Sequence, residues 1–247
     1  MKNYFYDLRY QVDNEEWRAR AKRDLIFQFW RKYFLKRDKK AKILDFGCGT
    51  GVLQEQFLKR FDVNVHGIDI SKEAIRYCKK RGLSQVKIFN GKTIPFKANS
   101  FDLVTAIDVV EHIKDDIHAL SEIKRVLKHK GITILLVPAH PKFWSTRDID
   151  LQHFRRYEVG ELERKCKKIG FKIIASKNVD FGVYFLFSLL HILAPKRKGI
   201  AQMGMDTAST GKVLNELMFM YELLENKLQN IGSFPIGLSI AVIAQKI

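Results

Sequence analysis

The sequence predicts an α/β protein with a mostly parallel β-sheet that is covered by helices on both faces. Two observations support this fold class. Short runs rich in Val, Ile and Leu alternate along residues 42–139 with segments whose apolar residues recur at three- and four-residue spacing. Strands that are apolar on both faces are typical of a sheet buried between two helical layers. A chain of 247 residues is long enough for one such domain with a full core.

The predicted elements follow one another in a regular order. We expect strands in KILDF (42–46), VNVHGIDI (63–70), VKIFN (86–90), FDLVTAID (101–108) and GITILLVPA (131–139). We expect helices in GVLQEQFLKRF (51–61), SKEAIRYCKKRG (71–82) and DDIHALSEIKRVLKHKG (115–131), and Gly82 and Gly131 stand where helices commonly end. Another helix and strand are expected in 158–181, a helix in 212–229 and a last strand in 236–247.

A helical segment precedes this pattern, and an insertion interrupts its end. Residues 14–37 are rich in Trp, Phe and Arg, so we expect an N-terminal helical arm in residues 1–40 and the main domain in residues 41–247. The insertion spans about residues 181–234 and contains VYFLFSLLHILAP (183–195), followed by Lys196, Arg197 and Lys198. This run is shorter than the roughly 20 residues that cross a bilayer. The apolar run could lie in a membrane interface, with the basic residues meeting anionic head groups. The alternatives are a lid helix buried against the N-terminal arm and a dimer contact.

The charge balance indicates which partners the chain attracts. The formal net charge is +17, which attracts nucleic acid, anionic membrane or acidic substrates, unless the lysines are simply solvated. The three cysteines, Cys48, Cys78 and Cys166, are far apart and odd in number. They argue against a disulfide framework or a zinc site, and no metal ligand set is predicted. The N-terminal residues are too polar for a signal peptide, so we expect a cytoplasmic protein, with peripheral membrane contact as an option.

The stretch ILDFGCGTG (43–51) joins a predicted strand to a predicted helix through three glycines. Free backbone N–H groups at such a turn suit anions or polar ligands. Gly47, Gly49 and Gly51 follow a GxGxG spacing, and Val52 stands where the dinucleotide fingerprint requires a third small residue. No Gly-Lys-Ser/Thr follows, so the phosphate loop of nucleotide hydrolases is absent as well.

Two carboxylates narrow the choice of ligand. Asp45 lies just before the glycine turn and can accept hydrogen bonds from an ammonium group. Asp69 ends the second predicted strand and can bind both hydroxyls of a ribose. The alternatives are a turn residue for Asp45 and a helix N-cap for Asp69, although Ser71 already suits that role. A ligand with an ammonium group, a ribose and no phosphate is S-adenosylmethionine, which leaves S-adenosylhomocysteine as its product.

The motifs, in their order, resemble those of the class I S-adenosylmethionine-dependent methyltransferases over roughly Lys42 to Lys246. The matching segments are ILDFGCGTG, GIDIS, FNGKTIPFKANSFDLVTAIDVVEHI and SEIKRVLKHKGITILLVP. The resemblance implies a Rossmann-like, seven-stranded, mostly parallel sheet whose last strand is antiparallel. The cofactor contacts that it implies are Asp45, Gly47, Cys48, Gly49 and Gly51 around the methionine part, Asp69 on the ribose, Ile70 against the adenine face, Asn90 and Gly91 at the adenine edge, and Ile107 and Asp108 along the cofactor. Many relatives carry Asp at the position of Asn90, whose carbonyl oxygen can still meet the adenine amino group.

The methyl acceptor is less well specified. The Asn/Asp-Pro-Pro-Tyr motif of amine methylation is absent after the fourth strand, and no cysteine stands there, which disfavours a nucleobase acceptor. A hydroxyl acceptor would benefit from a base, and His112 and His153 are the candidates. Each of them is otherwise a structural hydrogen bonder. In WSTRDIDLQHFRRYEVGEL (144–162), Trp144, Asp148, His153, Arg155, Arg156 and Tyr157 gather just after the fifth strand, where the substrate mouth is expected.

This loop, EEWRARAKRD (15–24) and the closing Gly237-Leu238-Ser239 resemble a subgroup of the family. Members of that subgroup are often associated with surface glycans, lipid-linked sugars or other secondary metabolites. The resemblance fixes no substrate; together with the absent amine motif, it leads us to expect methyl transfer to a small-molecule or lipid-linked glycan acceptor, with oxygen as the accepting atom. An RNA methyltransferase and a non-catalytic binding protein with the cofactor fold are the alternatives.

Overall fold

The computed structural model describes residues 3–34, 40–193 and 211–247, and these contain one seven-stranded sheet. The strands are β1 (Lys42–Phe46), β2 (Asn64–Asp69), β3 (Val86–Ile88), β4 (Phe101–Ile107), β5 (Leu127–Pro138), β6 (Phe171–Val179) and β7 (Ser239–Lys246). Their order is β3-β2-β1-β4-β5-β7-β6. The pairs among β1 to β5 are parallel, whereas β7 runs antiparallel to both β5 and β6. The predicted fold class is therefore confirmed.

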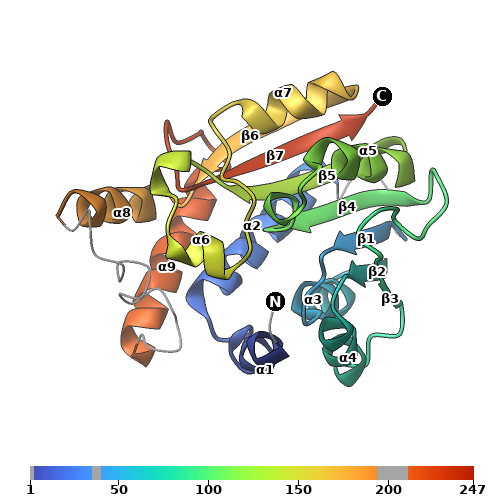
Figure 1. Ribbon diagram of the computed structural model, residues 1–247, viewed down its shortest axis with the longest axis horizontal. Coiled ribbons are helices and arrows are strands. Elements are labelled where there is room, and N and C mark those ends of the chain that lie inside the picture. Colours follow the sequence, from blue (N-terminus) through green and yellow to red (C-terminus); the bar gives the residue numbers. More distant parts are fainter. Residues whose placement is uncertain (1–2, 35–39, 194–210) are drawn as a thin grey trace.

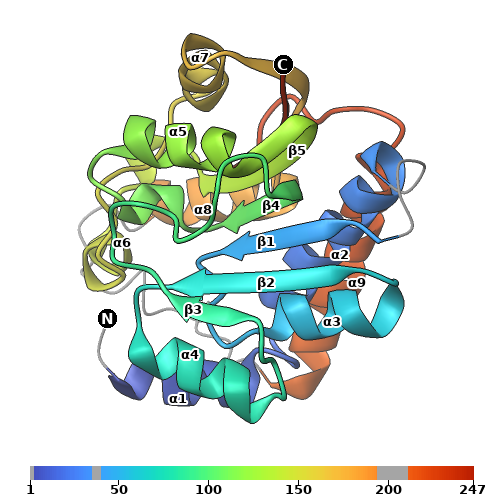
Figure 2. The same cartoon turned by 90° about the vertical axis from the view of Figure 1, so that its right-hand side faces the viewer.

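Helices cover both faces of the sheet (Figures 1 and 2). On one side lie α2 (Trp17–Tyr33), α3 (Val52–Arg60), α4 (Lys72–Lys80) and α9 (Lys212–Leu228), and on the other side lie α5 (Asp116–Val126) and α7 (Glu161–Lys168). The remaining helices are α1 (Asn3–Val12), α6 (Thr146–Asp150) and α8 (Phe181–Leu193), with the short 3₁₀ helices η1 (Val110–His112) and η2 (Pro141–Phe143). Among the described residues, none of these helices is both long and apolar enough to cross a membrane.

The hydrophobic core has one half on each face of the sheet. Phe27 and Trp30 of α2 pack with Phe57 of α3 against β1, β2, β4 and β5. On the opposite face, Leu120 of α5 and Leu162 of α7 belong to a second cluster with β4 and β7. The large aromatic side chains of the N-terminal arm are thus buried directly against the sheet, where burial stabilises the fold most.

The N-terminal arm contains two helices, although the sequence predicted only the second. The break between them follows from the cap of α2, where the side chain of Glu16 accepts a hydrogen bond from the backbone N–H of Ala19 at 3.1 Å. The first helix, α1, packs against α4 through stacked Tyr10 and Tyr77 rings. Short helices with little apolar periodicity of their own depend on such tertiary contacts, which explains why the sequence pattern did not reveal α1.

The predicted helix 115–131 is too long, and Gly131 does not mark its end. The helix stops at Val126 because Leu127 already pairs with Phe101 at the start of β5. Lys130 then takes a left-handed backbone conformation with φ of 62°. A Cβ atom on Gly131 would lie 2.8 Å from the carbonyl oxygen of Lys128, so this glycine permits a tight turn inside β5. Gly82, in contrast, follows α4 with φ of 83°, as predicted.

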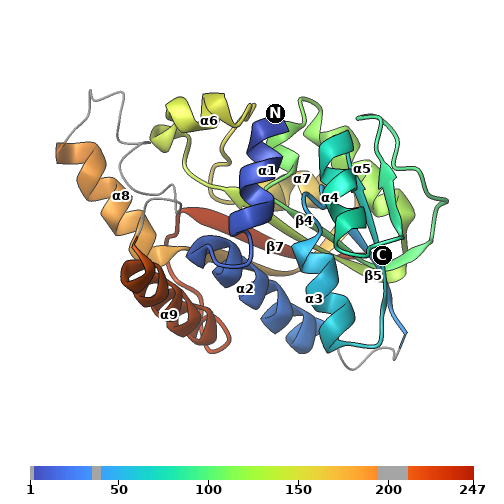
Figure 3. The same ribbon diagram turned by 90° about the horizontal axis from the view of Figure 1, so that it is seen from below.

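The insertion before β7 is tied to the N-terminal arm. Figure 3 shows α9 lying alongside α2, and the side-chain amide of Asn226 on α9 donates to the backbone carbonyl of Ala21 at 2.9 Å. The start of α8 is fixed by Glu225 of α9, whose carboxylate accepts the backbone N–H of Phe181 at 2.7 Å. The basic residues Lys196, Arg197 and Lys198 lie outside the described residues.

Candidate active site

A cavity of about 1160 Å³ opens at the carboxyl ends of β1, β2, β4 and β5. Its walls come from α1 and α2, the glycine turn, η1, and the loop that contains α6. Sites for single small ligands are typically about 300–1,000 Å³, so this cavity has room for a cofactor and a second molecule. The carboxyl ends of the strands are where this kind of sheet binds its ligands.

The glycine turn brings the backbone to the edge of this cavity. Gly47 and Gly49 have φ of 74° and 52°, which residues with a side chain rarely adopt. A Cβ atom on Gly47 would lie 2.3 Å from a methyl group of Val109, so no side chain fits there. A Cβ atom on Gly49 would meet nothing within 4 Å, and Gly49 lines the cavity. The missing side chain of Gly49 therefore leaves space for a ligand in direct contact with the turn.

The backbone N–H groups of this turn are already in use, contrary to the expectation of free donors. Those of Gly47 and Cys48 donate to the carbonyl of Ile68 at 2.8 and 3.0 Å, and that of Gly49 donates to Asp69 at 3.0 Å. These amides therefore do not form a phosphate cradle. Gly51 does not line the cavity. Its φ of 83° and the close approach of Leu83 make it a packing position at the start of α3.

Asp45 lies one residue before the end of β1 and places a buried carboxyl group in the cavity wall. Its Oδ1 atom accepts a hydrogen bond from the hydroxyl of Thr105 on β4 at 2.8 Å. Burial raises the pKa of Asp45 to about 7, against the effect of the Thr105 hydrogen bond, and the nearby charge of Asp69 adds to the increase. A cationic ligand would restore the ionised form, so the site is suited to an ammonium group.

Asp69 is held at the end of β2 by two backbone donors. Its Oδ2 accepts from Gly49 at 3.0 Å and its Oδ1 from Ser71 at 2.9 Å. The backbone N–H of Ile70 and the hydroxyl of Tyr6 also hydrogen-bond to Asp69, so a pair of ligand hydroxyl groups would share this carboxylate with Tyr6 or displace it. Ser71, rather than Asp69, caps α4 by accepting from Ala74 at 3.3 Å, as the sequence indicated. The neighbouring Ile70 is 68% exposed and lines the cavity, which offers an apolar surface to a flat ring.

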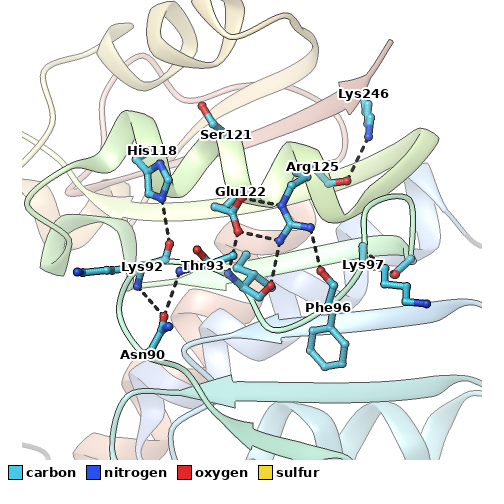
Figure 4. Close-up of polar contacts among 12 residues, drawn as sticks. Asn90, Lys92, Thr93, Phe96, Lys97, His118, Ser121, Glu122, Arg125 and Lys246 are labelled. Carbon is cyan, nitrogen blue, oxygen red and sulfur yellow. Dashed lines mark hydrogen bonds and ion pairs between the residues drawn. The ribbon is translucent and has the colours of Figure 1, made fainter.

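The loop after β3 gives different roles to Asn90 and Gly91. Gly91 lines the cavity, whereas Asn90 is exposed and does not. The Oδ1 atom of Asn90, which the sequence analysis assigned to the adenine amino group, accepts the backbone N–H groups of Lys92 and Thr93 at 3.0 and 3.1 Å (Figure 4). Both lone pairs of that oxygen are thereby used in a local turn.

The same loop is fixed from α5 by a charged pair (Figure 4). Arg125 donates to the backbone carbonyls of Phe96 at 2.8 Å and Ile94 at 2.9 Å, and to the carboxylate of Glu122. Glu122 in turn accepts the backbone N–H of Ile94 at 2.8 Å. These charge-assisted hydrogen bonds hold the loop, and with it Gly91, at the cavity.

Basic residues of α2 enter the cavity wall, and the sequence analysis did not identify them. Lys22 forms an ion pair with Asp108, which follows β4 with φ of 52°. Burial opposes ionisation of Asp108, but Lys22 and nearby Arg18 outweigh it and lower its pKa. Arg23 is buried in the cavity wall, and its Nε has no hydrogen-bond partner among the described residues. Burial lowers the pKa of Arg23 to about 10, so an anionic ligand group would be favourable beside it.

Asp148 organises the loop that follows β5. Its buried carboxylate accepts from the Nδ1 of His153 at 2.9 Å and the Nε of Arg156 at 2.8 Å, and it also accepts the backbone N–H of Ser145 at 2.9 Å. Although burial acts in the opposite direction, these partners lower the pKa of Asp148 to about 2. The ring of His153 is thereby oriented through one nitrogen.

The other half of the loop is anchored to α5. Asp116 accepts the hydroxyl of buried Tyr157 at 2.9 Å and pairs with Arg155 at 2.7 Å and Lys165 at 2.6 Å. The segment HFRRY (153–157) is therefore held by two carboxylates. His153 and Arg156 contact Asp148, whereas Arg155 and Tyr157 contact Asp116. These two aspartates explain the arginines near the start of α7, where the helix dipole alone disfavours them.

Both candidate bases lie in the cavity wall. The rings of His112 and His153 are 4.5 Å apart between centroids, at an angle of 83°. Burial lowers the pKa of His112, and neighbouring His153 lowers it further. Beside them lies Glu111, which is fully buried and whose carboxyl pKa burial raises well above its ordinary value. Glu111 is not among the site residues predicted from the sequence, because only the fold shows that its side chain points inward.

Comparisons with known proteins agree with this geometry. A family model described as a methyltransferase domain matches residues 44–135. An uncharacterized protein of Methanocaldococcus jannaschii is 33% identical over 180 residues, which cover 70% of this chain and 72% of the relative. Demethylmenaquinone methyltransferase of Geobacillus stearothermophilus is 32% identical over 51% of this chain, and sterol 24-C-methyltransferase ERG6B of Gibberella zeae is 38% identical over 57%. The chain spans only 58% and 39% of the length of these two enzymes.

Solved structures show the same fold. Haemonchus contortus phosphoethanolamine N-methyltransferase 2 in complex with S-adenosyl-L-methionine matches with a TM-score of 0.58 and 23% identity, over 90% of this chain and 52% of that chain. The cyclase SpnF matches with a TM-score of 0.58 and 22% identity, over 92% and 80%. The chain belongs to the class I S-adenosylmethionine-dependent methyltransferases. The open space at Gly49 and the carboxylates of Asp45 and Asp69 fit its methyl donor, S-adenosylmethionine.

Proposed function

We propose that this methyltransferase transfers a methyl group to an oxygen atom of a small molecule or of a lipid-linked glycan. The observation that carries the proposal is that one cavity of about 1160 Å³ is lined both by Asp45 and Asp69 and by His112 and His153. A cofactor between the two aspartates leaves the remaining space to an acceptor. The relatives named for quinone and sterol substrates support an acceptor that is small and partly apolar.

The cofactor is proposed to lie across the ends of β1, β2 and β4. Asp45 would bind its ammonium group and buried Arg23 its carboxylate, because these two side chains supply opposite charges in the same cavity wall. Gly47, Cys48 and Gly49 would contact the methionine part through the backbone. The ribose hydroxyls would meet Asp69, and the adenine would lie between Ile70 and Gly91, with Ile107 and Asp108 along its length.

The acceptor end is proposed to use the two histidines. Because the Nδ1 of His153 is bonded to Asp148, its Nε2 is the atom left to act on the acceptor hydroxyl. Transfer from a sulfonium is an in-line displacement, so the main contribution of the protein is to align the two molecules. The N-terminal arm (1–40) and the insertion (181–234) would complete the wall around them, as separate additions to the main domain.

Peripheral contact with the cytoplasmic face of a membrane is part of this proposal. α8 exposes Phe185, Leu186 and Leu189, at 53%, 43% and 53%. Its buried side packs Val183 and Tyr184 against Phe143, a residue of the cavity wall. The facing helix α9 adds further exposed apolar residues, namely Val213, Leu214, Leu217, Met220, Leu224 and Leu228. Apolar side chains next to the cavity suit an acceptor that is delivered from a lipid surface.

Flotation with vesicles tests this contact. We expect the full-length protein to float with vesicles of phosphatidylcholine and phosphatidylglycerol at low salt, and less with phosphatidylcholine alone. Leu186→Asp and Leu189→Asp should reduce flotation, whereas Leu58→Asp, an equally exposed leucine on α3, should not. Absence of flotation with anionic vesicles at low salt would contradict the membrane contact.

Methyl transfer itself is tested with methyl-labelled S-adenosylmethionine. The protein is incubated in parallel with a membrane lipid extract, a small-molecule extract and total RNA from the source cells. The proposal expects label in the lipid or small-molecule fraction. Label that enters RNA would instead support an RNA methyltransferase, the alternative favoured by the net charge of +17. Tight cofactor binding without label in any fraction would favour a non-catalytic role.

A further inference from the structure

Three side chains from two separate segments meet in the wall of the cavity. Glu111 and His112 belong to η1, and His153 belongs to the loop after α6. Within the described part of the chain, one donor atom from each lies within 4.8 Å of the others. Ligands of a single ion with bonds of about 2.0–2.2 Å lie about 3–4 Å apart. Small side-chain rotations therefore suffice to bring the three atoms to one ion.

The carboxylate of Glu111 lacks a partner. Its side chain is fully buried, and neither oxygen has a hydrogen-bond partner among the described residues. Leaving a buried charge unpaired is strongly destabilising. The neighbouring cations are committed elsewhere, since Lys22 pairs with Asp108 and Arg156 pairs with Asp148. The position therefore calls for a further positive charge or for an uncharged carboxyl group.

His153 is oriented as metal-binding histidines usually are. Its Nδ1 lies 2.9 Å from the carboxylate of Asp148, which fixes the ring and leaves Nε2 for a ligand. Gln152, directly before it, has φ of 60°, a conformation that costs energy and is retained mainly where the surroundings require it. The backbone N–H of Phe154 donates to the carbonyl of Glu111 at 2.8 Å, which joins the two segments that carry the three side chains.

We propose that Glu111, His112 and His153 bind a divalent transition-metal cation, of the class of Zn²⁺, Fe²⁺ or Mn²⁺. Two imidazoles and one carboxylate are ligands that such ions accept. Three protein ligands leave at least one position open, and all three residues line the cavity. What the ion does there rests on the proposed function: it would bind an oxygen atom of the acceptor. His112 and His153 would then act on the acceptor through the cation instead of as bases.

Binding of the metal alone tests this site, independently of activity. The full-length protein is stripped with a chelator and dialysed against Co²⁺, whose absorption spectrum distinguishes nitrogen and oxygen ligands from thiolates. We expect one ion per chain and no thiolate charge-transfer band. His153→Ala and Glu111→Gln should each weaken binding at least tenfold, and Asp148→Asn about 10- to 100-fold. His129→Gln changes an exposed histidine away from the cavity and should leave binding unchanged.

Three results would overturn the proposal. The first is no stoichiometric Co²⁺ binding at millimolar metal. The second is equal Co²⁺ affinity of the wild type and of His153→Ala. This variant is the more informative one, because His153 lies at a partly exposed loop position that tolerates truncation better than buried Glu111. The third is a thiolate band, which would assign the ion to Cys48 and Cys78, whose sulfur atoms lie 3.8 Å apart. If methyl transfer persists in the metal-free protein, the proposed function stands and the histidines keep the role of bases.

Discussion

The Nη2 atom of Arg18 on α2 lies 3.1 Å from the Oδ2 atom of Asp180, at the junction of β6 and α8. The same oxygen accepts the hydroxyl of Ser239 in β7 at 2.7 Å. One buried carboxylate thus joins the EEWRARAKRD segment, the start of the insertion and the closing Gly-Leu-Ser. These three distant parts of the sequence build one corner of the structure beside the cavity.

Asp180→Asn should lower the free energy of unfolding by about 1.5–3 kcal/mol, because it removes the buried counter-charge of Arg18, whose side chain is 17% exposed. Asn tolerates the left-handed conformation of this position, whose φ is 62°, so the change isolates the charge. Urea unfolding measures the effect. Glu216→Gln breaks the exposed pair with Arg20 and should leave the free energy of unfolding nearly unchanged. A cost for Asp180→Asn as small as that of the control would contradict this account.

Asp45 should make cofactor binding depend on pH. Because the pKa of Asp45 is about 7, its carboxyl group is mostly protonated at lower pH. The carboxyl group must then lose its proton before it can bind the ammonium group of the cofactor. Affinity for S-adenosylmethionine should therefore rise from pH 5 to pH 7 and then level off. Because the folded pKa is raised, the stability of the free protein should show the opposite trend and fall from about pH 4 to pH 7. Calorimetry in buffers of different ionisation enthalpy measures the proton released.

Asp45→Asn should remove that pH dependence and weaken binding roughly 10- to 100-fold, the usual value of a charge-assisted hydrogen bond. An unchanged rise of affinity with pH in this variant would assign the titration to another group.

Thr105→Val should move the pH dependence to higher pH. The hydroxyl of Thr105 favours the ionised form of Asp45, so its removal raises the pKa further at nearly constant shape. Thr133→Val provides a matched control, since Thr133 is equally buried on neighbouring β5 and donates only to the carbonyl of Val104. The measurement is the midpoint of the affinity profile. A midpoint shifted to the same extent by both substitutions would show that the Thr105 hydrogen bond is not its cause.

Arg125→Met should raise the KM for S-adenosylmethionine about tenfold with little change in kcat. The substitution removes the hydrogen bonds that hold the loop after β3, and with it Gly91, at the cavity. Steady-state kinetics separates the two constants. Arg76→Met, on the exposed surface of α4, should leave both unchanged. A fall in kcat at constant KM would show instead that the loop acts on the acceptor.

The sheet, and the position of Asp45, Gly47, Gly49 and Asp69 at one end of the cavity, could be predicted because their signals are local. The strands carry apolar runs, and Asp45, the glycines and Asp69 stand at fixed distances from strand ends. Side chains whose role depends on tertiary contacts could not be found in this way. Glu111 stands in a Glu-His pair with His112 to which the sequence assigns no fixed role, and Arg23 acquires a role only because α2 covers the sheet.

Other predictions failed where the chain satisfies its own polar groups. Asn90 uses its oxygen for a local turn, and the glycine turn uses its N–H groups on Ile68 and Asp69. A sequence motif indicates which atoms are present, but only the fold shows which of them remain available to a ligand.

The most direct test of the central claim is a calorimetric titration of S-adenosylhomocysteine into the wild type and into Asp69→Asn. The account predicts one site per chain in the wild type and affinity at least tenfold weaker in the variant, because the ribose hydroxyls lose a charged acceptor. Asp62→Asn, at the exposed position before β2, serves as the matched control and should bind like the wild type. Equal affinity of the wild type and folded Asp69→Asn would contradict the placement of the cofactor across β1 and β2.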